Sequence, residues 1–193
     1  MAELEQKCFI ITPNNEKQRE SLEGLMISVI EPTLVEIGFQ KRNIDVTYRM
    51  AEKKPISAKI ITRIIEDALC IVNLTGLDPY VMYKLAIRHA TSKPVVVLAE
   101  EGTNLPFELK DEQTIFYQNT ILGEVKLRSS LKDILISIFH LSEYTSSNPI
   151  LNLLKDQDMI ANLRPDKDEE GKMDVLIRKM YDIDQKLTRL LDE

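Results

Sequence analysis

The sequence predicts an α/β protein with a parallel sheet of about five strands, helices on both faces of the sheet, and a helical C-terminal extension. Short apolar segments alternate along the chain with segments of helical periodicity, which is typical of parallel sheets with crossover helices. The segment 94–99 (PVVVLA) is apolar almost throughout, as expected of a strand covered on both faces. The alternation therefore favours strands joined by helices that cover one continuous sheet.

Each predicted strand is a short run of apolar or β-branched residues. The five runs are 7–12, 44–48, 69–74, 94–99 and 114–117. Helices are expected over 16–37, from the N-cap Ser57 onward, over 79–91 and over 125–141. Gly38 is placed to end the first helix, and Pro32 inside it allows a kink or an early break.

The chain has 193 residues, enough for one α/β domain and an appendage. The polar stretch 146–149 (SSNP) marks the boundary, so we expect a domain of residues 1–147 and a helical extension of residues 148–193. In the extension, apolar residues repeat with the spacing of a heptad seam: Met173, Leu176, Met180, Ile183, Leu187 and Leu190. So short a seam needs a partner. We expect a homo-oligomer through this segment, and a helical hairpin within one chain is the alternative.

Composition excludes several function classes. The net charge of −6 argues against nucleic acid as a partner, because that binding depends on phosphate neutralisation. No run reaches transmembrane length, and the start MAELEQK lacks the apolar core of a signal peptide. Cys8 and Cys70 lie in strand-like runs, which predicts two buried free thiols and a reducing compartment. We expect a soluble cytoplasmic protein.

No cofactor or metal is expected. His89 and His140 lack metal-ligand spacing, and neither a GxGxxG motif nor a P-loop occurs. His89 shares a helix face with Met82 and Leu85, so a packed core histidine is favoured over an acid–base group.

The stretch 70–91 (CIVNLTGLDPYVMYKLAIRHAT) predicts a buried strand, a tight loop and a helix. Asp78 is placed as the N-cap and Pro79 at the first helical position. Polar groups between the carboxyl end of a strand and a helix N-terminus form the ligand sites of α/β folds. Thr12 and Asn14 hold the corresponding place after the first strand, where backbone N–H groups bind a phosphate or sugar hydroxyl, or asparagine simply caps the helix.

Several pieces of the chain resemble the nucleoside 2-deoxyribosyltransferase-like superfamily. They are KCFIITP at 7–13, Arg49 with Glu52, NLTGLDPYVMYKLAIRHATSKP at 73–94, and LPFEL at 105–109. The superfamily's form of the longest piece is roughly DLTG-x-NPNVFYELG-x-RHA-x-x-KP, and it aligns without gaps. The resemblance spans about residues 7–120. It implies a flavodoxin-like domain that cleaves or transfers at N-glycosidic bonds with a glutamate nucleophile.

The resemblance fails at the residues that carry the chemistry. The nucleophile position is Lys84, the first Asp of DLTG is Asn73, and the Arg-Ala-Asp-Glu piece reads 49–52 (RMAE). An ammonium at its usual pKa is no nucleophile and repels an oxocarbenium-like transition state. An amide hydrogen-bonds a sugar hydroxyl but takes no proton.

The remaining candidates each have two interpretations. Asp78 matches an acidic position of the superfamily's transferases and is also a helix N-cap, so it is a candidate catalytic acid together with Glu52. Lys84 either faces the ligand or lies on the helix surface, paired with one of these acids. Arg49 and Arg88 are candidates for phosphate or base contacts, or are surface charges.

Three functions follow as hypotheses. The first is a nucleoside- or nucleotide-binding protein impaired in glycosidic-bond chemistry, with Thr12, Asn14, Arg49, Asn73, Lys84 and Arg88 as ligand-binding residues. The second is an active nucleosidase, N-glycosidase or deoxyribosyltransferase that uses Asp78, Glu52 or the pair Glu100–Glu101. The third is an interaction protein that acts through its C-terminal helices. Fold alone does not choose among them.

Overall fold

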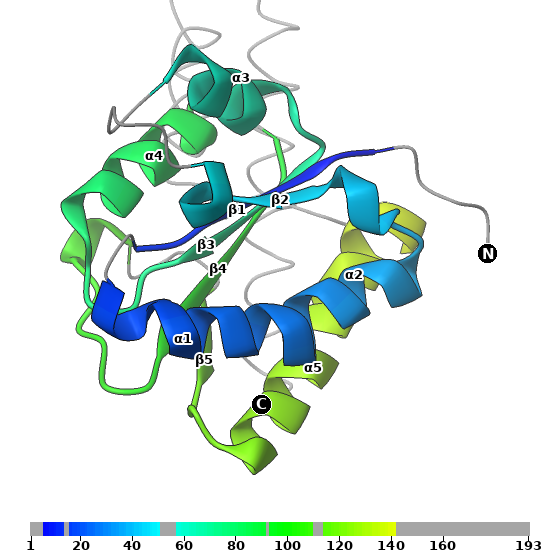
Figure 1. The fold of residues 1–193 in the computed structure, drawn as a ribbon, viewed down its shortest axis with the longest axis vertical. Helices are drawn as coiled ribbons and strands as arrows, with labels where there is room; N and C mark the ends of the chain where they lie inside the picture. Colours follow the sequence, from blue (N-terminus) through cyan, green and yellow to red (C-terminus); the bar gives the residue numbers. More distant parts are fainter. Residues whose placement is uncertain (1–5, 14–15, 51–56, 92, 110–113, 142–193) are drawn as a thin grey trace, which may run out of the picture. The chain divides into compact units, whose positions relative to one another are not determined.

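The computed structural model describes residues 6–13, 16–50, 57–91, 93–109 and 114–141. Five parallel strands form one sheet in the order β2-β1-β3-β4-β5 (Figure 1). Their bounds are β1 Cys8–Ile11, β2 Ile44–Val46, β3 Leu69–Asn73, β4 Val95–Glu100 and β5 Thr114–Tyr117. This order is flavodoxin-like, with the order reversing between β1 and β3. The predicted parallel sheet of five strands is therefore confirmed.

The helices lie between the strands as the sequence predicts. They are α1 Glu16–Leu25, the π-helical η1 Met26–Ile30, α2 Glu31–Ile37, α3 Ala58–Glu66, α4 Pro79–His89, α5 Ile121–Ile136 and the π-helical η5 Ser137–Leu141. Short 3-10 turns are η2 Lys41–Asn43, η3 Thr47–Met50 and η4 Phe107–Leu109. Pro32 does not break the first helix: the chain stays helical through it, and the π-helical η1 directly precedes the α2 turn that contains it.

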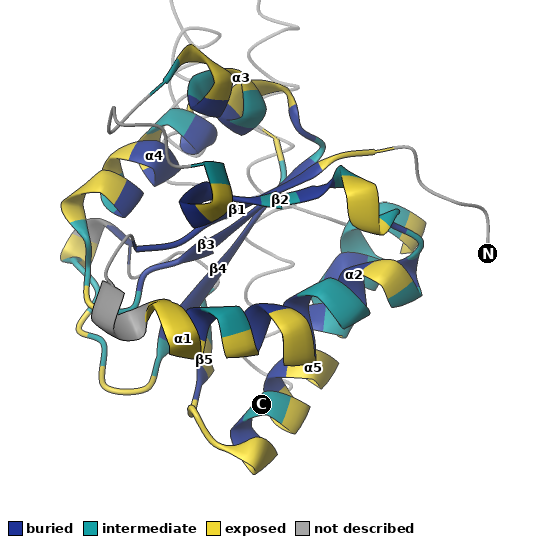
Figure 2. Ribbon diagram, viewed as in Figure 1, coloured by how far each residue is buried: buried dark blue, intermediate teal, exposed yellow. Residues whose placement is uncertain are grey.

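Two apolar clusters lie on opposite faces of the sheet. Helices α1, α2 and α5 cover one face, and α3 and α4 cover the other (Figure 1). Strands β1, β3 and β4 are buried almost throughout (Figure 2). Cys8 belongs to the first cluster and Cys70 to the second, so the two thiols point to opposite faces. Burial raises the pKa of both, and that of Cys70 reaches about 12.

The ends of the helices and strands confirm some of the boundaries predicted from capping and turn residues and correct others. Gly38 ends α2 with a φ of 114°, and the Ser57 hydroxyl caps α3 by accepting from the Ile60 N–H, as predicted. The predicted strand 44–48 is too long, because the chain turns into η3 at Thr47. The last helix begins at Ile121 rather than 125, since Thr120 caps it by accepting from the Gly123 N–H.

The predicted C-terminal extension, 148–193, lies outside the described residues. Its heptad segment and the expected homo-oligomer therefore stay predictions. Among the helices that the structure describes, none has the length and apolarity to cross a membrane.

Candidate functional site

The carboxyl edge of the sheet gathers most of the polar residues singled out from the sequence. Thr12 follows β1, Asn73 ends β3, and the loop 74–78 leads from β3 into α4. These segments flank the position between β1 and β3 where the strand order reverses, which is where open α/β sheets bind ligands. The topology thus brings these segments to the same edge of the sheet, and their role in ligand binding stays a prediction.

Asn73 is buried, and both ends of its amide make a hydrogen bond. Its Oδ1 accepts from the Thr75 N–H at 2.9 Å, and its Nδ2 donates to the Tyr117 hydroxyl at 3.0 Å. The Thr75 hydroxyl lies 3.4 Å from the Tyr117 hydroxyl and accepts from the Glu100 N–H at 2.9 Å. This network ties the carboxyl ends of β3, β4 and β5 together, so Asn73 supports the wall of the site.

Asp78 is the N-cap of α4, as predicted. Its Oδ1 accepts from the N–H groups of Tyr80 at 2.8 Å and Val81 at 3.3 Å. Two successive left-handed residues precede it, Gly76 with φ 75° and Leu77 with φ 51°. This conformation is unusual for leucine. The loop therefore turns sharply and aims Asp78 at the helix N-terminus.

Lys84 lies on the sheet-facing side of α4 and is 7% exposed. Within the described parts of the chain, no hydrogen bond or ion pair reaches its ammonium. Burial lowers the pKa of Lys84 from its ordinary value, and the charge of Asp78 opposes that shift. Lys84 therefore has a largely buried side chain, and its ammonium makes no hydrogen bond to another described residue.

Thr12 is occupied by a contact within the protein. Its N–H donates to the Thr47 hydroxyl at 3.1 Å, and the two hydroxyls lie 3.3 Å apart. The same Thr47 hydroxyl donates back to the Thr12 carbonyl at 3.3 Å. The pair joins the carboxyl ends of β1 and β2, which explains why β2 ends early.

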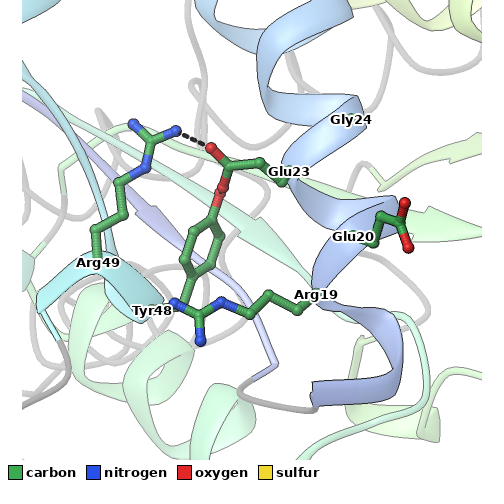
Figure 3. A pocket seen from close by; sticks show the side chains of 6 residues that line it. All are labelled: Arg19, Glu20, Glu23, Gly24, Tyr48 and Arg49. Atoms are coloured by element: carbon green, nitrogen blue, oxygen red, sulfur yellow. Dashed lines mark hydrogen bonds and ion pairs between the residues drawn. The ribbon is translucent and has the colours of Figure 1, made fainter.

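Arg49 lies in a cluster with Tyr48 and Glu23 (Figure 3). The Glu23 carboxylate accepts from the Tyr48 hydroxyl and from Arg49, and the tyrosine bond above all lowers its pKa. Burial raises the pKa of Tyr48 to about 12. The guanidinium groups of Arg19 and Arg49 lie 5.6 and 5.8 Å from the Tyr48 ring centre.

The described residues form two open hollows along this edge. The α1 hollow, about 650 Å³, is lined by Arg19, Glu20, Glu23, Gly24, Tyr48 and Arg49 (Figure 3). The β3–β4 hollow, about 430 Å³, is lined by 75–77 and 100–104, which include Glu100 and Glu101. Thr12, Asn73, Asp78 and Lys84 line neither hollow.

The position of Arg88 contradicts both predictions for it, a contact to a ligand phosphate or base and a surface charge. It is fully buried, and its guanidinium makes five hydrogen bonds of 2.8–3.2 Å to the carbonyls of Ile64, Asp67, Ala68 and Pro94. These carbonyls lie before β3 and β4, at the amino edge of the sheet. Arg88 is therefore a structural residue at the end opposite to the candidate site. His89 is buried beside it in α4, as expected of a core histidine.

Two predicted residues, Asn14 and Glu52, lie outside the described residues, so their proposed roles stay predictions.

The sequence did not point to Tyr117, Tyr48 or Glu23 as residues of the candidate site. Tyr117 ends the last strand and thus reaches the same edge as Asn73. The predicted strand 114–117 could therefore have pointed to it. The link between Glu23 and Tyr48 has no such signal, since 25 residues separate them.

Comparison with known proteins is limited. No protein-family model matches the sequence, and no curated protein matches it. The structure is similar to that of the CMP N-glycosidase BcmB from Clostridium botulinum, with a TM-score of 0.46 and 16% sequence identity. That match covers 65% of this chain and 99% of the other. These values are too low to transfer an activity.

Proposed function

We propose that this chain is a divergent member of the nucleoside 2-deoxyribosyltransferase-like superfamily that binds an anionic, nucleotide-type small molecule and is impaired in glycosidic-bond cleavage. The observation that carries the proposal is Lys84, a lysine with a largely buried side chain near Asp78, at the position of the superfamily's nucleophile. A ligand phosphate would pair with this ammonium, which makes no hydrogen bond to another described residue. The motif 73–94, ungapped against the superfamily form, supports the ligand class.

The state of the neighbouring groups supports impaired catalysis. Asn73 cannot act as an acid or base, and its amide is engaged with Thr75 and Tyr117. One oxygen of Asp78 already caps α4. A carboxylate nucleophile is missing at residue 84, where a positive charge would oppose an oxocarbenium-like transition state.

Calorimetry with nucleoside monophosphates and the matching nucleosides tests the proposal. We expect monophosphates to bind more tightly than nucleosides and Lys84→Gln to remove that preference. Lys126→Gln, an exposed lysine on α5, is the matched control and should change nothing. If no nucleotide binds, the proposal is wrong. If Lys84→Gln binds nucleotides as the wild type does, Lys84 is not part of the binding site.

One observation favours a second candidate, an active N-glycosidase. Glu100 and Glu101 line the β3–β4 hollow beside Thr75, and an inverting hydrolysis needs two carboxyl groups, one as base and one as acid. Release of free base from a nucleoside monophosphate or NAD, followed by chromatography, would favour this candidate. Activity that persists in a variant combining Asp78→Asn, Glu52→Gln and Glu100→Gln would count against these acids as the catalytic groups.

A further inference from the structure

The basic side chains of helix α4 are buried, and its outer side is uncharged. The basic residues are Lys84, Arg88 and His89, and the helix contains no acidic residue. The exposed residues of α4 are Pro79, Tyr80, Tyr83 and Ala86 (Figure 2). A helix that faces water normally carries charged residues on its outer side, and one without them is normally covered. The outer side of α4 therefore has the composition of a contact surface.

Two tyrosines dominate this outer side. Tyr80 is 58% exposed and Tyr83 is 56% exposed, and their spacing of three residues places both rings on one side of the helix. Tyrosine is enriched at protein interfaces, where charged residues are depleted. Helix α5 differs, because it exposes Lys126 and Arg128. The composition of α4 is thus not shared by the helix that covers the other face of the sheet.

Helix α3 packs beside α4 and continues its apolar surface (Figure 1). Arg63 of α3 pairs with Asp45 of the edge strand β2, so the opposite side of α3, with Ile61 and Ile65, points toward α4. Ile65 is 42% exposed and Ile61 is half-buried. The α3–α4 face is defined here as the outer surface of both helices, with Ile61, Ile65, Pro79, Tyr80, Tyr83 and Ala86.

The charges at the two ends of the α3–α4 face complement those of a second copy. At the carboxyl edge of the sheet, Lys59 begins α3 and Asp78 caps α4. At the amino edge, Glu66 ends α3 and Lys93 follows α4. When two copies pack face to face with antiparallel helices, Lys59 meets Glu66 of the second copy and Asp78 meets Lys93. Lys93 donates one hydrogen bond to the Glu66 carbonyl at 2.8 Å and keeps further donors.

From this surface we propose that the α3–α4 face is the interface of a two-fold symmetric dimer of this chain, with antiparallel helices. The inference goes beyond the proposed function and does not depend on nucleotide binding. Antiparallel packing also opposes the helix dipoles, and a two-fold axis lets one uncharged surface pair with itself, although the chain has a net charge of −6.

The size of the face sets the expected strength of the dimer. The 11 residues of α4 span about 16 Å, and two helices are about 20 Å wide. Such a face covers less than the roughly 800 Å² per partner of a standard interface, so the dimer should be weak. The association predicted through residues 148–193 is a separate contact.

Sedimentation velocity of the intact chain at rising micromolar concentrations tests the proposal. We expect the mass to rise from monomer toward dimer. Tyr83→Glu and Tyr80→Glu should each weaken this association about tenfold or more, because they bury an unpaired charge. Tyr80 lies in the first turn, where an acidic residue favours the helix, so Tyr80→Glu keeps α4 folded. Val125→Glu, at a valine of α5 that is also exposed, is the matched control and should associate as the wild type does.

Cross-linking with a short bismaleimide locates the contact. Cys8 and Cys70 are buried, so an added exposed cysteine is the reactive thiol among the described residues. Ala86→Cys, in the middle of the α3–α4 face, should give covalent dimers, and Ser129→Cys on α5 should give few.

Two results would overturn the proposal. The first is a wild-type chain that stays monomeric at every concentration, as it would if another segment or another protein covers the face. The second is self-association that neither Tyr83→Glu nor Tyr80→Glu weakens, which would assign the contact to other residues, such as 148–193.

Discussion

The Asn73 amide donates to the Tyr117 hydroxyl at 3.0 Å, across the strand β4 that separates β3 from β5. This bond lies where three strands reach the carboxyl edge, next to the β3–β4 hollow. The superfamily that this sequence resembles has an acid at the position of Asn73. In this chain the same position holds a structural residue.

Tyr117→Phe should destabilise the protein by about 1–3 kcal/mol, because it leaves the buried Asn73 Nδ2 without its acceptor. Tyr83→Phe is the matched control, since Tyr83 is 56% exposed on α4, and it should change the free energy of unfolding very little. Urea denaturation measures both. Equal effects of the two substitutions would show that the Asn73–Tyr117 bond does not contribute.

Lys84→Met should raise the free energy of unfolding at about pH 7, because burial of the Lys84 side chain on folding disfavours its charged form. The pKa of Lys84 is lowered on folding, so the folded state releases its proton first as the pH rises. The wild type therefore gains stability as the pH rises from the folded pKa toward the unfolded value of about 10.4, and the advantage of Lys84→Met shrinks. Urea denaturation from about pH 7 to pH 10 tests the sign, with Lys126→Met as the control. A variant less stable than the wild type at every pH would contradict this account.

Arg88→Met should destabilise the protein by more than about 3 kcal/mol, since it leaves four backbone carbonyls, two of them in fully buried hydrogen bonds, without their shared donor. Arg88→Lys should recover only part of this loss, because an ammonium has three donors and lacks the planar fork. Arg128→Met, at an exposed ion pair with Glu36, should change stability by less than about 0.5 kcal/mol. A small effect of Arg88→Met in thermal or urea denaturation would reopen a ligand role for Arg88.

Two glycines should respond to alanine in opposite directions. A methyl group on Gly24 in α1 meets no atom within 4 Å in the described structure, so Gly24→Ala should stabilise by about 0.5–1 kcal/mol. A methyl group on Gly123 would lie 2.1 Å from the Gln118 carbonyl oxygen, so Gly123→Ala should destabilise by about 1–3 kcal/mol. Thermal denaturation of the two variants gives the comparison. Shifts of the same sign would contradict the open surroundings of Gly24 or the close approach at Gly123.

Sequence patterns determined the fold and part of the site because they reflect local physics. Apolar runs of strand length, Gly38 after a helix, and Ser57 and Asp78 as N-caps each depend on neighbours within a few residues. The same patterns placed Asn73 and Asp78 at one edge, because parallel strands end together.

The tertiary structure alone decided what the long polar side chains do. Arg88 and Lys84 lie one turn apart and carry the same charge, but only Arg88 reaches the carbonyls that precede β3 and β4. Contacts between residues distant in sequence, such as Thr12 with Thr47 and Tyr48 with Glu23, have no local signal. Whether a buried charge finds a partner depends on which chain segments pack against it, and helical periodicity carries no information on that packing.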